Sequence, residues 1–300
     1  MGSTRPILVI GGLGFIGTAV VRKLLERGYW VEVWDDLRTG QEGRLEGHDR
    51  LSVKLVDATK PETWKVQASY AVAINCAGVS LTDDPPMDIV SVDTAITTAM
   101  MCHLPAASLI MLSEASITGP SSSLDPHNEV NGDNAVDWPS RSKLICEKML
   151  SQGEQPWASI RLPKVVYGKG QRIDSRYGIV ESVISAALDS TPVVFERNGL
   201  DRFDMVSVED VASLVADVAE KLPKSLPKPV INACKGKHYS PDELVDLVRS
   251  LGYAANVTKR TGGVPKEWCY PASRPATIVY RWRPKFEIEQ YVSDSLPVKE

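Results

Sequence analysis

The sequence has little of what marks several classes of protein. Its five cysteines are scattered without a C-x-x-C pair and its four histidines have no partners at ligand spacing, so neither a disulfide framework nor a metal site is expected. No apolar run approaches the ~18 residues of a membrane span, and the first residues predict a strand rather than a signal peptide. A net charge of −4 gives no reason to expect nucleic acid or a membrane surface. We therefore expect a cytoplasmic protein that acts on a small molecule.

The most informative stretch is residues 7–17, which read I-L-V-I-G-G-L-G-F-I-G. Its apolar start predicts a buried parallel strand, and residues 18–28 carry apolar side chains at helical spacing. Gly11, Gly14 and Gly17 stand between the two. In this context Gly11 permits a tight turn, Gly14 leaves room for a pyrophosphate, and Gly17 lets the helix lie close to the strand. The pattern predicts a dinucleotide-binding site.

An acidic residue indicates which dinucleotide this is. Residues 29–34 predict a second strand, and Asp35 follows Gly17 by 18 residues. A carboxylate there accepts hydrogen bonds from the adenosine ribose and repels a 2′-phosphate, which favours NAD over NADP. Arg38 points the other way, because a nearby arginine accommodates a 2′-phosphate.

Two further strand ends are expected at the same crevice. Residues 51–57 predict a strand that ends on Asp57, and residues 71–78 predict one that ends on Ala77 and Gly78. Ligands of open parallel sheets bind beyond the carboxyl ends of the strands. Asp57 is therefore a candidate contact for the adenine amino group, with an ordinary surface acid as the alternative. The small Ala77 and Gly78 let the dinucleotide backbone pass.

The alternation of predicted strands and helices continues to about residue 165 and then fades as prolines become frequent. This predicts an α/β fold, a doubly wound parallel sheet of the Rossmann type, in residues 1–165, with returning segments from about 200–235. Most of residues 166–300 are predicted to form a smaller C-terminal α+β lobe for the substrate. A polar segment, residues 119–134, is predicted to be an active-site lid or a plain connector.

These motifs resemble the extended short-chain dehydrogenase/reductases, the NAD-dependent epimerase/dehydratases that act mainly on nucleotide sugars. The resemblance rests on the glycine turn with residues 35–40 (D-D-L-R-T-G), on residues 141–144 (R-S-K-L), on 161–168 (R-L-P-K-V-V-Y-G) and on 281–285 (R-W-R-P-K). It implies hydride exchange with NAD at a sugar carbon, and a homodimer formed through the helices that carry the family's lysine. That lysine, which binds the nicotinamide ribose, is Lys143 here.

The residues for acid/base chemistry differ from the family's pattern. The family's tyrosine, which exchanges a proton with the sugar, is replaced by Pro139, which has none to exchange. The family's serine or threonine after the fifth strand aligns with Glu114, next to Ser113. We predict Glu114 as a replacement acid/base, provided that burial raises its pKa, and Ser113 as a hydrogen-bonding helper. The alternative is a Glu114–Lys143 ion pair that fills the vacated site.

Positions on the substrate side also depart from the family. The asparagine that contacts the nucleotide sugar is replaced by Lys164, and the family's later arginine aligns with Phe203, one place after Arg202. We predict Lys164 and Arg202 as substrate-binding residues. Tyr177 is a weaker candidate for a substitute acid, whereas Tyr167 matches a structural tyrosine of the family.

Three functions remain open. The first is a divergent NAD-dependent nucleotide-sugar epimerase/dehydratase-like oxidoreductase with altered acid/base residues. The second is a catalytically inactive NAD(P)-binding protein with a regulatory or structural role, and the third is a non-redox lyase that retains bound NAD. The predicted catalytic residues are Lys143, Glu114 and Ser113. The predicted cofactor-binding residues are Gly11, Gly14, Phe15, Ile16, Gly17, Asp35, Asp57, Ala77, Gly78 and Lys143.

Overall fold

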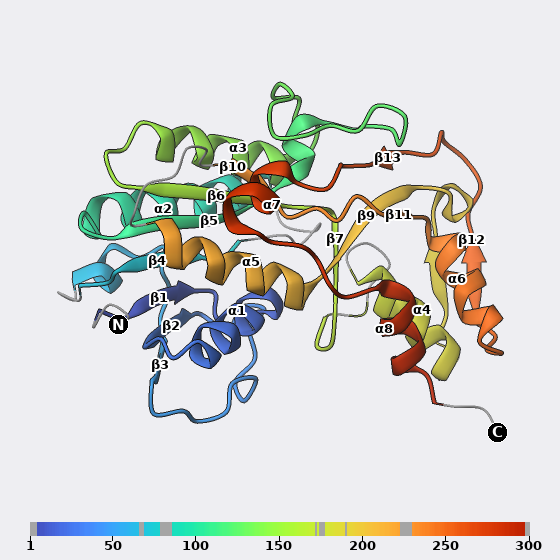
Figure 1. The fold of residues 1–300 in the computed structure, drawn as a ribbon, viewed down its shortest axis with the longest axis horizontal. Coiled ribbons are helices and arrows are strands. Elements are labelled where there is room, and N and C mark those ends of the chain that lie inside the picture. Colours follow the sequence, from blue (N-terminus) through green and yellow to red (C-terminus); the bar gives the residue numbers. More distant parts are fainter. Residues whose placement is uncertain are drawn as a thin grey trace.

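The computed structural model describes residues 5–65, 69–78, 86–171, 173, 178–189, 191–222 and 230–297. The fold is organised around a sheet of seven strands in which every neighbouring pair is parallel (Figure 1). Across this sheet the strands are β10 (Val230–Asn232), β6 (Trp157–Leu162), β5 (Ser108–Glu114), β4 (Val72–Asn75), β1 (Ile7–Ile10), β2 (Val31–Asp35) and β3 (Leu51–Leu55). The predicted doubly wound α/β fold is confirmed.

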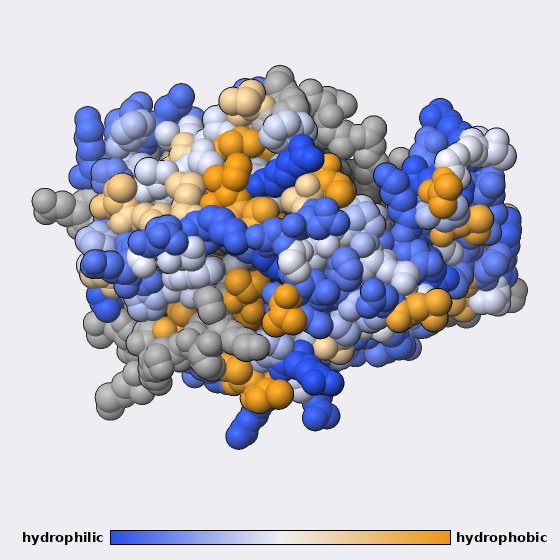
Figure 2. All heavy atoms as spheres, turned by 90° about the horizontal axis from the view of Figure 1, so that it is seen from above, coloured by the Kyte–Doolittle hydropathy of each residue, from blue (hydrophilic) through white to orange (hydrophobic). Residues whose placement is uncertain are grey.

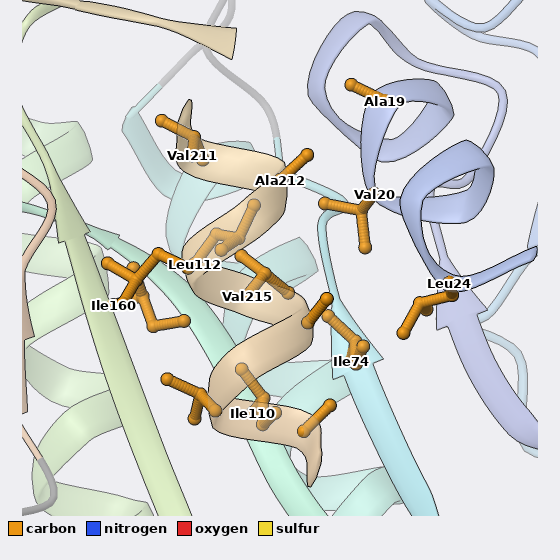
Figure 3. Packing of buried hydrophobic residues seen from close by; sticks show 14 of the residues in the cluster. Ala19, Val20, Leu24, Ile74, Ile110, Leu112, Ile160, Val211, Ala212 and Val215 are labelled. Atoms are coloured by element: carbon orange, nitrogen blue, oxygen red, sulfur yellow. The ribbon is translucent and has the colours of Figure 1, made fainter. Parts of the chain in front are cut away.

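Helices cover both faces of this sheet, which explains why its inner strands are mostly apolar and almost entirely buried. The residues of β1 and β4, for example, are all buried. One face is covered by α1 (Phe15–Glu26) and α5 (Val208–Lys221), and the other by α2 (Pro86–His103) and α3 (Trp138–Ser151). Figure 3 shows side chains of α5, such as Val215, between those of the strands, such as Leu112, and those of α1, such as Val20.

A second, smaller body of the structure lies beyond the carboxyl ends of the strands (Figure 1). Its core is a separate apolar cluster. Its strands are β7 (Val165–Tyr167), β8 (Val193–Phe195), β9 (Arg202–Ser207), β11 (His238–Tyr239), β12 (Val257–Lys259) and β13 (Glu267–Trp268). Its helices are α4 (Ile179–Leu188), α6 (Pro241–Ser250) and α8 (Ile288–Ser295), and short 3-10 helices η1 (Pro61–Lys65), η2 (Ala115–Thr118) and η3 (Arg197–Gly199) connect other elements.

The chain crosses between the two bodies more than once. Within the predicted returning segment, about 200–235, α5 and β10 belong to the layers of the large sheet, whereas β9 belongs to the smaller body. The helix α7 (Arg274–Tyr280) and the adjoining Trp282 also pack there, and the Trp282 indole donates a hydrogen bond to the backbone oxygen of Asp210 at 2.9 Å. The division at residue 165 stays a prediction, and this late return was not predicted from the sequence.

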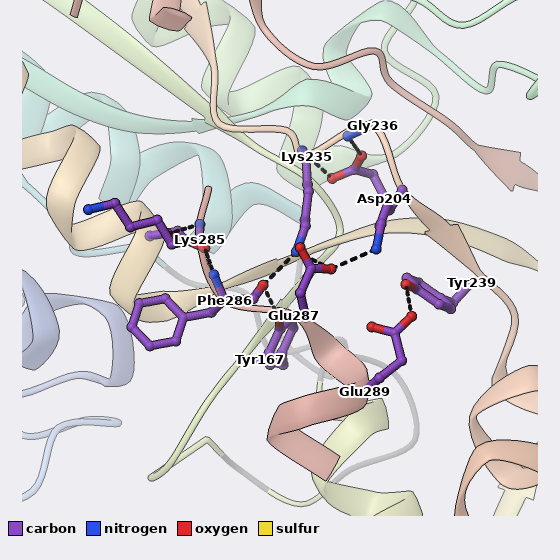
Figure 4. Close-up of polar contacts among 11 residues, drawn as sticks. Tyr167, Asp204, Lys235, Gly236, Tyr239, Lys285, Phe286, Glu287 and Glu289 are labelled. Atoms are coloured by element: carbon purple, nitrogen blue, oxygen red, sulfur yellow. Dashed lines mark hydrogen bonds and ion pairs between the residues drawn. The ribbon is translucent and has the colours of Figure 1, made fainter. Parts of the chain in front are cut away.

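Polar contacts hold the last part of the chain against the smaller lobe (Figure 4). The Tyr167 hydroxyl and the Lys235 ammonium both donate to the backbone oxygen of Phe286, at 3.0 and 2.6 Å. Lys235 also pairs with Glu287 at 2.9 Å. These contacts give Tyr167 a structural role, in agreement with its match to a structural tyrosine.

The surface adds little about partners. None of the helices among the described residues is long and apolar enough to cross a membrane. On the face seen in Figure 2, apolar side chains lie in several groups separated by hydrophilic residues.

Candidate active site

A cavity of about 300 Å³ opens at the carboxyl ends of the large sheet, and a smaller one of about 90 Å³ adjoins it. The two share Gly14, Thr39, Cys76, Ala77 and Gly78 as lining residues. Together they form a continuous crevice from the end of β2 to the start of α3. This is the place where ligands of parallel sheets bind.

The glycine turn forms one wall of this crevice. Gly11 has a φ of +73°, and a Cβ on it would lie 2.7 Å from the backbone nitrogen of Ala77. A Cβ on Gly17 would lie only 2.0 Å from the backbone oxygen of Gly11. The tight turn and the close helix packing therefore both require glycine. The helix α1 begins after Gly14 without a side-chain cap, and its first turn lines the cavity through Gly14, Phe15, Ile16 and Gly17. Uncapped N–H groups at the start of a helix are suited to bind an anion.

Asp35 lies at the end of β2 against this turn. Its carboxylate accepts hydrogen bonds from the backbone nitrogens of Leu13 and Leu37, both at 2.9 Å. The carboxylate thus holds the glycine turn and also lines the smaller cavity. Arg38 lines it too, 3.9 Å from Asp36. The ribose contact of Asp35 stays a prediction.

Asp57 lines the same smaller cavity and accepts two hydrogen bonds from Thr59, from its backbone nitrogen at 2.8 Å and its hydroxyl at 2.6 Å. Burial alone would raise the pKa of this carboxyl, but these hydrogen bonds, together with the charges of Lys60 and Arg38, lower it. The side chain is therefore ionised and fixed at the edge of the crevice. Its contact with adenine stays a prediction.

Lys143 points from α3 to the floor of the crevice, where its ammonium pairs with Asp93 of α2 at 2.8 Å. The second Asp93 oxygen accepts from the Ser142 hydroxyl at 2.7 Å, and only 2% of the Asp93 side chain is exposed. Burial alone would lower the pKa of Lys143, but the charge and hydrogen bond of Asp93 raise it above its ordinary value. A Cβ on Gly78 would lie 2.9 Å from the ammonium nitrogen, so Gly78 leaves the lysine open to the crevice.

Glu114 lines the large cavity, as do Lys143 and Pro139. The ion pair between Glu114 and Lys143 that the sequence left open is not formed, because Lys143 is paired with Asp93. The Glu114 carboxylate accepts a hydrogen bond from the Ser116 hydroxyl at 2.8 Å. Burial raises the pKa of Glu114 above its ordinary value, although the charge of Lys164 acts in the opposite direction. This is the direction that a proton-exchanging carboxyl requires.

Ser113 also lines the cavity, but its hydroxyl donates to the buried carboxylate of Glu147 at 2.8 Å. Glu147 accepts further from Ser159 at 2.7 Å and from the Arg161 guanidinium at 2.6 and 2.9 Å. The Ser113 hydroxyl therefore donates its proton to a buried carboxylate and not to a group in the cavity. A helper role for Ser113 stays a prediction, and the hydroxyl would act there as an acceptor.

Lys164 and Asp137 form a second ion pair in the large cavity, at 2.9 Å. The Lys164 ammonium also lies 4.4 Å from the centre of the Trp268 ring. Asp137 is the N-cap of α3 and accepts from the backbone nitrogen of Ser140 at 3.0 Å. Burial alone would raise the pKa of Asp137, but Lys164 and Ser140 lower it.

Not every predicted residue reaches the cavity. Arg202 is not among the described residues that line it. Instead, its guanidinium donates to Glu243 at 2.9 Å and to the backbone oxygen of His238 at 2.8 Å. The geometry gives its substrate-binding prediction no support. Tyr177 lies outside the described residues. No cluster of metal-ligating side chains occurs within the described ranges.

Asp93 and Asp137 were missed from the sequence, although a signal existed for one of them. An aspartate directly before a helix that carries proline in its first turn is typical of an N-cap, and Asp137 precedes Trp138 and Pro139 in this way. Asp93 had no such signal, because its meaning depends on the approach of α2 to α3.

Comparisons with known proteins identify the family of the chain. Residues 7–234 match the model of the NAD dependent epimerase/dehydratase family. A dTDP-L-rhamnose 4-epimerase from Burkholderia thailandensis is 24% identical, with 97% of this chain and 93% of that protein covered.

Two solved structures show a similar fold. The structure of a Thermus thermophilus UDP-glucose 4-epimerase in complex with NAD matches with a TM-score of 0.83, 23% identity and 96% of each chain covered. A dTDP-glucose 4,6-dehydratase from Bacillus anthracis, also in complex with NAD, matches with a TM-score of 0.84, 18% identity and 97% and 95% coverage.

Proposed function

We propose that this chain, which belongs to the NAD-dependent epimerase/dehydratase family, is an enzyme that acts on a nucleotide sugar with Glu114 as its acid/base. One observation carries the proposal. Among the described residues, Glu114 is the only carboxylate of the large cavity without a cation within 4.0 Å, because Lys143 and Lys164 are paired with Asp93 and Asp137. Glu114 is therefore free to exchange a proton with a ligand.

The crevice has the shape and chemistry that NAD requires. The glycine turn leaves a cradle at the N-terminus of α1 that a Cβ at Gly17 would destroy. In the proposal Gly11, Gly14 and Gly17 hold the pyrophosphate, Asp35 the adenosine ribose, and Asp57 the adenine, while Lys143 reaches the nicotinamide ribose past Gly78. NAD, when bound, supplies hydride transfer at a sugar carbon.

The chain's own residues supply the proton transfer. As base, the Glu114 carboxylate takes the proton of a sugar hydroxyl onto its own oxygen, and as acid it returns that proton. The Ser116 hydroxyl orients it by donating to one carboxylate oxygen, which leaves the other oxygen for the substrate. Lys164 presents an ammonium at the same cavity for polar groups of the substrate.

Replacement of Glu114 tests the proposal. Glu114→Gln keeps the Ser116 acceptor but cannot exchange the proton, so we expect nucleotide-sugar turnover to fall by about 10²–10⁴-fold while NAD retention is unchanged. The measurement is the change in nicotinamide absorbance of purified protein with a panel of nucleotide sugars, after identification of the nucleotide released on denaturation. Unchanged turnover in the variant contradicts the acid/base role.

A second outcome of the same assay favours a different function. If NAD is retained tightly and no nucleotide sugar gives a signal, the regulatory or structural NAD-binding function is supported instead. The departures at Pro139 and Lys164 are what motivate this second candidate. A homodimer through the helices that carry Lys143, α3 of each protomer, is part of the proposal by family resemblance, and light scattering of the purified protein tests it.

A further inference from the structure

Two ion pairs flank Glu114 in the large cavity. On the floor, Asp93 binds the Lys143 ammonium at 2.8 Å. At the other side, Asp137 binds the Lys164 ammonium at 2.9 Å. All five side chains line the same cavity, so each ion pair acts on the charge of Glu114.

The pairs are built into separate elements that converge only in the folded chain. Asp93 comes from α2 and is fixed by the Ser142 hydroxyl at 2.7 Å, while Lys143 comes from α3. Asp137 is fixed as the N-cap of α3, and Lys164 follows β6. Each lysine is thus held by an aspartate that is itself anchored by a hydrogen bond.

We propose that Asp93 and Asp137 are positioning residues that hold the two cavity lysines away from Glu114, so that Glu114 keeps a proton that it can exchange. The inference rests on the acid/base role proposed for Glu114 and deepens it. If either aspartate were neutral, its lysine would be an uncompensated cation beside Glu114. Such a cation stabilises a carboxylate and would fix Glu114 in its ionised form.

The other groups near Glu114 are either neutral or paired with an opposite charge. The Ser116 hydroxyl is neutral, and so is the phenol of Tyr270, which packs nearby with Ala115. The charges of Arg161 and Glu147 behind β5 bind each other at 2.6 Å. Burial is the largest influence on the pKa of Glu114, and the charges that act on it are those of Lys164, Asp137 and Lys143.

A titration of Glu114 tests the inference without a substrate. Full-length, NAD-saturated protein carries ¹³C in its glutamate side-chain carboxyls, and the Glu114 resonance is identified as the one absent from Glu114→Gln. In Asp137→Asn, which retains an N-cap acceptor for Ser140, we expect the pKa of Glu114 to fall by about one unit or more. Asp93→Asn should lower it by a smaller amount, since Lys143 acts on Glu114 more weakly than Lys164.

Two further variants keep the test decisive if one aspartate variant fails to fold. Lys164→Met leaves the Asp137 charge uncompensated and should raise the pKa of Glu114. The double variant Asp137→Asn/Lys164→Met should return it towards the value of the unmodified protein. Asp133→Asn is the matched control, because Asp133 pairs with Lys148 at 2.7 Å on the exposed side of α3 and should leave Glu114 unchanged.

An unchanged pKa of Glu114 in Asp137→Asn and in Lys164→Met overturns the inference. So does a shift of the same size in Asp133→Asn. The titration decides this inference, whereas the turnover of Glu114→Gln decides the proposed function, so the two fail separately.

Discussion

The two ends of the crevice are built in different ways. At the NAD end, the critical contacts involve backbone atoms: Gly17 lies against the oxygen of Gly11, and Asp35 holds the nitrogen of Leu13. At the other end, where the proposed acid/base lies, side chains from β5, α2, α3 and the segment after β6 line the same cavity as Glu114. Backbone geometry leaves almost no tolerance for substitution, whereas a cluster of side chains can be exchanged together. The two ends therefore differ in how readily a substitution can be accommodated.

Lys143 lies where the two ends of the crevice meet. Its replacement should have the largest effect on stability and on NAD binding. Lys143→Ala leaves Asp93 as a buried, uncompensated charge, and we expect a loss of about 3–5 kcal/mol in the free energy of unfolding. We also expect weaker NAD binding and no turnover. Urea unfolding and equilibrium binding of NAD measure these effects.

The double variant Lys143→Ala/Asp93→Asn separates the two roles of Lys143. It removes the unpaired charge and should recover much of the stability, but not the NAD affinity. Unchanged NAD binding and turnover in Lys143→Ala would remove Lys143 from the site.

Gly17→Ala tests the backbone contacts at the NAD end of the crevice. The new Cβ would lie 2.0 Å from the Gly11 oxygen and 2.8 Å from the Gly12 Cα, so the turn must shift. We expect a cost of about 3 kcal/mol, which corresponds to roughly a hundredfold in NAD affinity if it falls on the bound form. Gly47→Ala is the control, because a Cβ there meets nothing within 4 Å. Equal NAD affinity in the two variants would contradict the backbone argument.

In the smaller lobe, Glu181 of α4 is expected to make the stability of the protein depend on pH. Its carboxylate accepts from the backbone nitrogen of Gly168 at 2.7 Å, and burial raises its pKa to about 7. Because the folded state holds this proton more tightly than the unfolded state, its contribution to stability is present at low pH and lost as the pH rises through about 7.

Glu181→Gln keeps an acceptor for Gly168 and removes the titration. Between pH 5 and pH 8 we expect the unmodified protein to lose about 2 kcal/mol more stability than this variant. Urea unfolding at the two pH values measures the difference. An identical pH dependence in both proteins would show that Glu181 titrates normally.

Arg202→Ala should have the smallest effect. Its guanidinium binds Glu243 and His238 on the partly exposed side of β9, and pairs of this kind contribute about 1 kcal/mol or less. NAD retention and the KM for any nucleotide sugar should stay within about twofold, given that it does not line the cavity. A large rise in KM would restore Arg202 as a substrate-binding residue and place the substrate further into the smaller lobe.

Much of the cavity could be predicted because its residues follow strand ends. Gly14, Asp35, Asp57, Ala77 and Glu114 all occur at or after the carboxyl end of a strand, or in the turn that follows one. Parallel strands bring these ends to one edge, so the sequence order is enough to gather them. Arg202 was predicted from the position of a family arginine and not from a strand end, and it begins β9, a strand of another sheet. Its substrate-binding role stays a prediction.

The sequence by itself determined the parallel sheet and the glycine turn, and it predicted that Pro139 stands where the family has its tyrosine. Each of these depends on local patterns: apolar runs, glycines at fixed spacing, and the identity of one residue. Only the tertiary structure decided which carboxylate each lysine binds. Lys143 is paired with Asp93, 50 residues away in the chain, and Lys164 with Asp137, 27 residues away. Ion pairs of this kind follow from how helices pack on a sheet, which no local pattern specifies.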